Sequence, residues 1–278
     1  MVDIILATNM IQFIYKIPAI FLMILSVYVI LKEIRKKNVL FNKQFYILIV
    51  CKLFNDICYM IFYYTLYKIP QYGFFKTFFE KNDWIAVLCY VLAALHITFM
   101  FLITLLISIN RYVAVKYPTK YEQYFSKSNR IKIIIFFIIL STFIGLGTIP
   151  FKAVYRMFNF ADLFIPYFRS KKVIYYQIFY TIVLYGTISI ATCIFNIKAI
   201  LKLKKLKKIS KNYKKEARYI IYSVFVFITL ATIEVFYVLS HISAQYEISS
   251  IRYIIHFCIV IGFDLISVGD YYFLIFTR

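Results

Sequence analysis

The sequence has 278 residues, and 63% of them belong to a hydrophobic set that includes tyrosine. Its 33 lysines and arginines stand against 12 aspartates and glutamates, which leaves a net charge of +21. A chain this apolar does not behave as a disordered polymer. With 6 glycines and 5 prolines, it also has little material for the many tight turns of an all-β fold. The apolar residues stand in long blocks, and this grouping favours helices.

Seven runs of mostly apolar residues are each close to the length of about 20 residues that spans a hydrocarbon layer of ~30 Å. The runs lack a period of two and are too long for single strands of a membrane barrel. The sequence therefore predicts an all-α membrane protein, a seven-transmembrane helix bundle that forms one domain over residues 1–278. The expected spans lie near residues 11–31, 44–67, 85–109, 133–150, 174–197, 219–240 and 251–276.

The basic residues predict how the chain is oriented in the membrane. Of the 33 lysines and arginines, 22 lie in residues 32–43, 111–132 and 198–218 or at Arg278. Loops rich in these residues stay on the cytoplasmic side, so we expect the amino terminus outside and the carboxyl terminus inside. The same charges flank apolar spans and would face lipid headgroups, which disfavours nucleic acid as a partner.

The sequence lacks the residue patterns that several kinds of chemistry require. The 5 cysteines form no CxxC or CxxxH pattern, and three isolated histidines cannot make the paired boxes of a membrane metal enzyme. A phosphate-binding GxxxxGK[ST] loop is missing. The seventh run has no lysine, which disfavours a light receptor that binds retinal through a Schiff base. We therefore expect no metal, no cofactor and no enzymatic activity.

Ionisable side chains inside the spans point to a polar network. Such groups cost about 2.5–3.5 kcal/mol at the bilayer centre, so they usually face the bundle interior or water. Lys52 and Asp56 are one helical turn apart, close enough to pair, and Asp264 and Asp270 lie in the seventh run. These four residues are interpreted either as an interhelical network that fixes packing or as a cluster that rearranges when the bundle changes state.

Polar and aromatic residues toward the outer ends of the spans are candidates for a ligand pocket between helices. Aromatic residues also gather at the interfaces of any membrane protein, so a purely structural role is the alternative for each of them. The candidates are His96, Tyr176, Tyr180, Glu234 and Tyr237.

Residues 197–218 form the most charged stretch of the chain. Ile200, Leu203, Leu206 and Ile209 recur every three residues, so a helix here would carry an apolar stripe beside a basic face. We expect this helix to continue the fifth span into the cytoplasm. It suits contact with anionic membrane lipids, and equally the docking of an acidic partner.

The string SINRYVAVKYPTKYEQYF, residues 108–125, follows the third span. Arg111 at this helix end is either a membrane anchor or a lock whose guanidinium holds neighbouring helices until they move. Pro118 is expected to end the helix.

This string, the layout of seven spans and the outside amino terminus resemble the rhodopsin-like G-protein-coupled receptors. The closest likeness is to the nematode serpentine chemoreceptors of class gamma (Srg), with the neighbouring class Srv as the alternative; NDICYM in the second span and DLISVGDYYFLIF near the end also resemble class gamma. The resemblance implies a receptor in the plasma membrane of sensory cilia that binds a small environmental molecule and activates a heterotrimeric G protein. By position, Asn110, Arg111 and Tyr112 would form the G-protein switch.

Three departures from the wider receptor pattern stand out. Asn110 replaces the acid that normally precedes the arginine. Residues 151–173 contain no cysteine, so Cys89 lacks the partner of the usual disulfide, and this outer loop must be held otherwise or more loosely. The seventh span has no Asn-Pro-x-x-Tyr motif.

The main alternative function is an ion-conducting or solute-transporting seven-helix protein, in which Lys52, Asp56, Asp264 and Asp270 would line an ion path. The chain shows neither a repeat between its halves nor the pair of Gly- or Pro-broken helices that transporters use. The receptor interpretation is therefore favoured.

Overall fold

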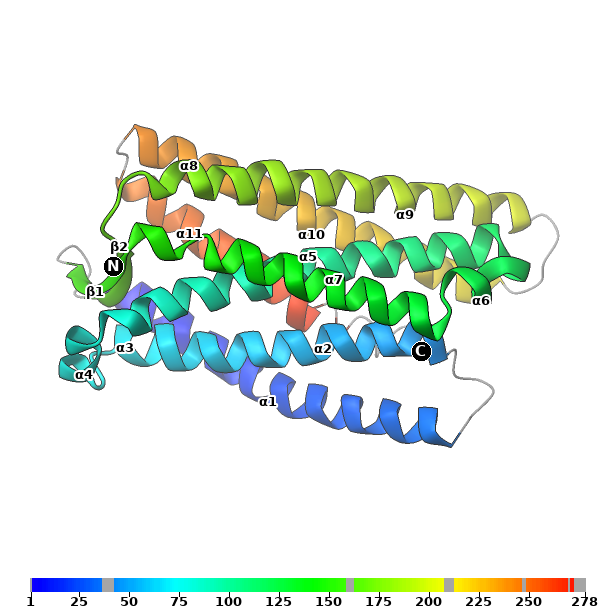
Figure 1. Ribbon diagram of the computed structural model, residues 1–278, viewed down its shortest axis with the longest axis horizontal. Coiled ribbons are helices and arrows are strands. Elements are labelled where there is room, and N and C mark those ends of the chain that lie inside the picture. Colours follow the sequence, from blue (N-terminus) through cyan, green and yellow to red (C-terminus); the bar gives the residue numbers. More distant parts are fainter. Residues whose placement is uncertain are drawn as a thin grey trace. The chain divides into compact units, whose positions relative to one another are not determined.

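The computed structural model describes residues 2–36, 43–158, 163–207, 213–246, 249–269 and 271–272. In these ranges helices dominate, and one pair of strands interrupts them (Figure 1). In chain order the elements are α1 (Val2–Arg35), α2 (Lys43–Tyr63), η1 (Tyr64–Lys68), α3 (Ile69–Gln71), α4 (Lys76–Lys81), α5 (Asp83–Lys116), η2 (Pro118–Lys120), α6 (Tyr121–Tyr124), α7 (Lys127–Leu146), η3 (Ile149–Phe151), β1 (Ala153–Phe158), β2 (Leu163–Phe168), α8 (Val173–Ile178), η4 (Phe179–Leu184), α9 (Tyr185–Lys207), α10 (Tyr213–Gln245), α11 (Ser249–Asp264) and η5 (Leu265–Gly269).

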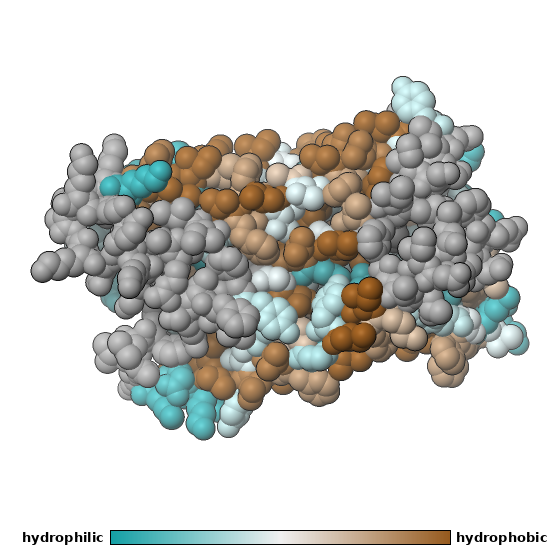
Figure 2. Space-filling model, turned by 180° about the vertical axis from the view of Figure 1, so that it is seen from behind, coloured by the Kyte–Doolittle hydropathy of each residue, from teal (hydrophilic) through white to brown (hydrophobic). Residues whose placement is uncertain are grey.

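Six helical stretches in the described residues are long and apolar enough to cross a membrane, and a seventh, shorter apolar stretch follows them. Hydrophobic side chains cover much of the described surface on the face shown in Figure 2, as expected for helices whose solvent is lipid. The predicted all-helical membrane fold is confirmed. The stretches are Met10–Arg35, Gln44–Gln71, Asp83–Lys116, Lys127–Phe151, Val173–Lys204, Val224–Ser243 and the shorter Cys258–Gly269.

Local chemistry explains several features of these helices. α5 ends at Lys116, two residues before Pro118, because proline has no N–H to continue the ladder and disfavours a helical residue before it. The hydroxyls of Thr98 and Thr192 each donate a hydrogen bond to the carbonyl four residues earlier, at 2.6 and 2.8 Å. Their donors are therefore satisfied within the helix even in an apolar layer.

Among the described residues three segments are π-helical: η1, η4 and η5. Each follows or precedes an α-helix without a break in the chain, and each changes which residues share a helix face, because the hydrogen bond closes five residues along. Sequence spacing based on 3.6 residues per turn therefore fails across them.

The chain forms two compact units. The first comprises Met1–Phe41, Val50–Met100 and Phe136–Tyr176. The second comprises Asn42–Ile49, Phe101–Ile135 and Gln177–Arg278. In the second unit α10 packs against both α9 and α11.

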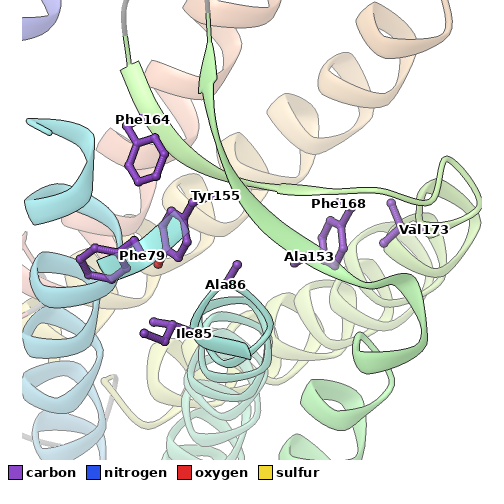
Figure 3. Packing of buried hydrophobic residues seen from close by; sticks show 8 residues of the cluster. All are labelled: Phe79, Ile85, Ala86, Ala153, Tyr155, Phe164, Phe168 and Val173. Atoms are coloured by element: carbon purple, nitrogen blue, oxygen red, sulfur yellow. The ribbon is translucent and has the colours of Figure 1, made fainter. Parts of the chain in front are cut away.

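β1 and β2 form an antiparallel hairpin in the first unit, within residues 151–173, which the sequence assigned to an outer loop. Ala153 pairs with Phe168 and Phe158 with Leu163. The hairpin is stabilised by a hydrophobic cluster to which both strands, α4 and the start of α5 contribute, including Phe79, Tyr155 and Phe164 (Figure 3). This burial explains a two-stranded sheet that would be marginal alone.

Candidate functional site

Arg111 lies near the end of α5 and packs between two aromatic rings. Its guanidinium carbon is 3.9 Å from the ring centroid of Tyr222 on α10 and 5.5 Å from that of Phe45 on α2. Tyr222 is buried. A guanidinium over an aromatic face within about 6 Å is attracted by the ring quadrupole. The contacts therefore tie the end of α5 to α10, and we call Arg111, Tyr222 and Phe45 the aromatic clamp.

The two neighbours of Arg111 contact other elements of the same unit. Asn110 is buried; its Nδ2 donates to the Tyr121 hydroxyl at 3.0 Å, and that hydroxyl can donate back to Oδ1 at 3.3 Å. Tyr121 belongs to α6, so a neutral amide ties the loop helix to α5. The Tyr112 ring lies 5.6 Å from that of Phe195 on α9. The three predicted switch residues thus reach α6, α10 and α9.

Lys52 and Asp56 form the ion pair that their spacing suggested. Lys52 Nζ lies 2.9 Å from Asp56 Oδ2, and the side chains are 2% and 1% exposed. Asp264 is buried in the second unit. Asp270 lies outside the described residues. The four-residue network as a whole therefore stays a prediction, and so does its role.

His96 links α5 to α2 in the first unit. The Asn55 amide donates to the His96 carbonyl oxygen at 3.2 Å, and Asn55 Oδ1 lies 2.9 Å from His96 Nδ1. The His96 ring also stacks on Phe62, with centroids 5.3 Å apart. These contacts make His96 a bridge between helices, whatever further part it has in a pocket.

Tyr176 is also a bridge in the first unit. Its hydroxyl donates to the Ile144 carbonyl at 2.7 Å, and its ring stacks on Phe151 with centroids 5.7 Å apart. The hydroxyl rests on Gly147, where an added Cβ would collide with it. The glycine therefore makes room for this contact between α8 and the end of α7.

Tyr180 and Tyr237 come together around Tyr185, a fully buried residue of α9 that no local sequence pattern singles out. The Tyr185 centroid lies 5.7 Å from that of Tyr180, 6.3 Å from that of Tyr237 and 4.5 Å from that of Phe101. We call these four residues the Tyr185 cluster. Tyr180 and Tyr185 are five residues apart, and the π-helical η4 between them brings both to one cluster.

Glu234 lies one turn before Tyr237 on α10 and faces α9. An added Cβ at Gly186 would lie 3.7 Å from Glu234 Oε2, so the carboxylate sits beside the residue that follows Tyr185. Within the described part of the chain, Glu234 Oε1 is buried and has no hydrogen-bond partner. One turn beyond Tyr237 on α10, His241 Nε2 lies 3.1 Å from the Thr181 hydroxyl. Polar groups thus flank the Tyr185 cluster on both sides.

The hairpin is held by hydrogen bonds and packing instead of the missing disulfide. The Tyr155 hydroxyl donates to the Leu66 carbonyl at 2.5 Å, and the Tyr90 hydroxyl donates to the Pro166 carbonyl at 2.8 Å. Cys89 is a buried thiol outside any disulfide. Burial, with the Cys89 thiol beside it, raises the pKa of the Tyr155 hydroxyl, which therefore stays a hydrogen-bond donor.

α9 continues to Lys207, which confirms that the fifth span extends into the basic segment. Lys198, Lys202 and Lys204 are exposed on this extension, and Ile200 and Leu203 are half-buried. The Leu206 side chain and Ile209 lie outside what the structure describes, so the full apolar stripe stays a prediction. No group of three or more histidine, cysteine, aspartate or glutamate residues in the described ranges is placed to hold a metal ion.

Comparison with known proteins identifies the family. Residues 9–278 match the Srg family of chemoreceptors. No curated protein matches the chain.

Proposed function

The chain belongs to the Srg family of chemoreceptors, and on that premise we propose that it activates a heterotrimeric G protein when a small environmental molecule binds between its helices. The family consists of seven-helix serpentine receptors without catalytic activity, and the chain is a multi-pass membrane protein. One receptor domain over the whole chain, an outside amino terminus and a place in the plasma membrane of a sensory cilium are parts of the proposal.

The observation that carries the coupling step is the aromatic clamp. Arg111 is the arginine of the Asn110-Arg111-Tyr112 switch, and its 3.9 Å contact with Tyr222 joins α5 to α10. In the resting receptor the clamp holds these two helices together. When α10 moves, the guanidinium leaves the ring and becomes available to the G protein. Arginine suits this role because its planar cation both stacks on rings and donates several hydrogen bonds.

The Tyr185 cluster with Glu234 is the proposed ligand site. Pockets in helix bundles combine aromatic walls with a few polar groups. Glu234 supplies a buried acceptor, Oε1, and the Ser189 hydroxyl lies close to the same carboxyl group. Tyr237 and Tyr222 both belong to α10, 15 residues or roughly 22 Å apart at 1.5 Å per residue. A ligand that displaces Tyr237 would therefore move the helix that carries the clamp. His96 and Tyr176 would contribute by fixing the helices of the first unit.

Two further partners belong to the proposal. The exposed lysines of the α9 extension would meet anionic headgroups on the cytoplasmic side. They would also lie near a G protein that engages Arg111.

The test is expression in cells that carry a reporter for several G-protein types, with surface expression measured for every variant. We expect a broad odorant panel to activate the wild type and Arg111→Ala to abolish the response at equal surface expression. A well-expressed wild type that couples to none of the G proteins would refute the proposal. Ligand-evoked current that persists with G proteins blocked would favour the ion-conducting alternative.

A further inference from the structure

The segment between the second and third membrane-spanning stretches has one buried side and one exposed aromatic side. Phe79 of α4 is 5% exposed and points into the hydrophobic cluster with Ile85 and Tyr155 (Figure 3). Tyr72 at the start of the segment is 40% exposed. Three phenylalanines of the segment, and Trp84 at the start of α5, are between 53% and 71% exposed. We call these residues the loop aromatic face: Phe74, Phe75, Phe78 and Trp84.

The backbone of this segment is defined by contacts of its own. Phe75 has a φ of 56°, which is unusual for a bulky residue, and Gly73 before it has a φ of 78°. α4 ends against Asn82, whose amide donates to the Phe78 carbonyl at 2.7 Å. The chain thus adopts a costly conformation here, and the Phe74 and Phe75 side chains are 61% and 71% exposed.

Polar atoms at the rim of the face are satisfied internally. The Trp84 indole N–H donates to Asn82 Oδ1 at 3.2 Å. The indole therefore needs no water for its one donor, and entering an apolar medium costs little. Because the indole N–H is already bonded, the face presents mainly carbon atoms to whatever covers it and few groups for directional hydrogen bonds.

We propose that the loop aromatic face lies in the headgroup–acyl boundary of the lipid bilayer. Both ends of the segment join membrane-spanning stretches, Gln44–Gln71 and Asp83–Lys116, so the bilayer surface is continuous with it. Tryptophan and other aromatic side chains favour this boundary. Lys81 at the end of α4 suits lipid phosphates, as in helices that lie flat in the interface, whereas Lys76 lies 3.8 Å from the Glu80 carboxylate of the same helix. Four side chains are also too few for a stable protein interface, which takes about 20–30 residues a side.

Trp84 allows a direct test because it is the only tryptophan among the 278 residues. The purified chain of 278 residues is placed in nanodiscs of plain phosphatidylcholine, or of phosphatidylcholine brominated at a shallow or a deep acyl position. We expect blue-shifted emission, loss of about half the intensity with the shallow bromines, a smaller loss with the deep ones, and little quenching by aqueous iodide. Trp84→Phe measures the background emission.

Two variants separate the face from general effects on folding. The triple variant Phe74→Ser, Phe75→Ser, Phe78→Ser should lose most of the shallow quenching and gain quenching by iodide. Tyr167→Ser, which removes an exposed ring of β2 outside the face, should leave both unchanged. Strong iodide quenching of the wild type without lipid quenching would overturn the proposal. So would protection from both quenchers, since that would indicate a second copy of the chain or another protein over the face.

Discussion

Replacing Asp56 with asparagine tests what the buried ion pair does. Lys52 Nζ and Asp56 Oδ2 are 2.9 Å apart, and both side chains are at most 2% exposed. Asp56→Asn leaves the ammonium group in place without this carboxylate. Breaking a buried pair in this way costs about 3–5 kcal/mol. At about 1.4 kcal/mol per factor of ten, the folded-to-unfolded ratio should fall roughly a hundredfold to a few thousandfold.

The matched control is the double variant Lys52→Met, Asp56→Leu, which removes both charges and keeps apolar volume. Such replacements are often neutral or stabilising, so we expect it to regain most of the wild-type melting temperature in nanodiscs, whereas Lys52→Met and Asp56→Asn alone lose it. A double variant as unstable as either single variant would refute the electrostatic reasoning.

The same variants separate packing from switching. Surface expression and G-protein signalling are measured together, and signalling is divided by the number of receptors at the surface. If Asp56→Asn lowers surface expression and leaves signalling per receptor unchanged, the pair fixes packing and the switch interpretation is wrong. If signalling per receptor changes in the well-folded double variant, the pair takes part in the change of state.

Four further predictions rest on single contacts. Tyr222→Leu should raise ligand-independent signalling about 2- to 30-fold, since a cation–π contact is worth about 0.5–2 kcal/mol, while Tyr222→Phe keeps the ring and the low basal level in the reporter assay. Tyr155→Phe should lower the free energy of unfolding by about 0.5–1.5 kcal/mol, measured by thermal unfolding. Arg169→Gln, which breaks an exposed ion pair with Asp83, should lower it by about 1 kcal/mol or less. Gly147→Ala should destabilise by about 1–3 kcal/mol through overpacking, and Tyr176→Ala in the same chain should relieve it.

Hydropathy and local spacing predicted the features that depend on one helix at a time. The apolar runs found the helices because lipid imposes one length and one composition on every span. Lys52 and Asp56 pair because they are four residues apart on a regular α-helix. Pro118 marks the end of α5 for a local steric reason. None of these requires knowledge of distant contacts.

The hairpin could not be predicted in this way because its stability comes from partners far along the chain. Tyr155 donates to Leu66, 89 residues earlier, and Tyr90 donates to Pro166, 76 residues later. The missing cysteine correctly indicated that the loop is held by other means. Which side chains hold it is a tertiary property, and two tyrosine hydroxyls among 27 tyrosines carry no local signal.

A π-helical segment explains why sequence spacing predicted only part of the Tyr185 cluster, whose role as a ligand pocket stays a prediction. Tyr180 and Tyr237 were identified as polar aromatic residues near helix ends, but Tyr185, which joins them, was not. On a regular α-helix Tyr180 and Tyr185 point in different directions, whereas η4 inserts the extra residue that lets both reach one cluster.

The free energy of the Arg111–Tyr222 contact determines how easily a small ligand could open the aromatic clamp. A ligand shifts an equilibrium only by its difference in affinity for the two states. The Arg111–Tyr222 contact is worth about 0.5–2 kcal/mol, which a roughly 2- to 30-fold preference for the open state would offset. Breaking a buried charge pair of the Lys52–Asp56 kind costs about 3–5 kcal/mol. A ligand would offset that cost only by binding the open state at least roughly a hundredfold more tightly than the closed one. Drug-sized ligands gain only ~0.3 kcal/mol per atom, and most of that is common to both states. A clamp made of a ring and a guanidinium is therefore matched to ligands whose affinity differs little between the two states.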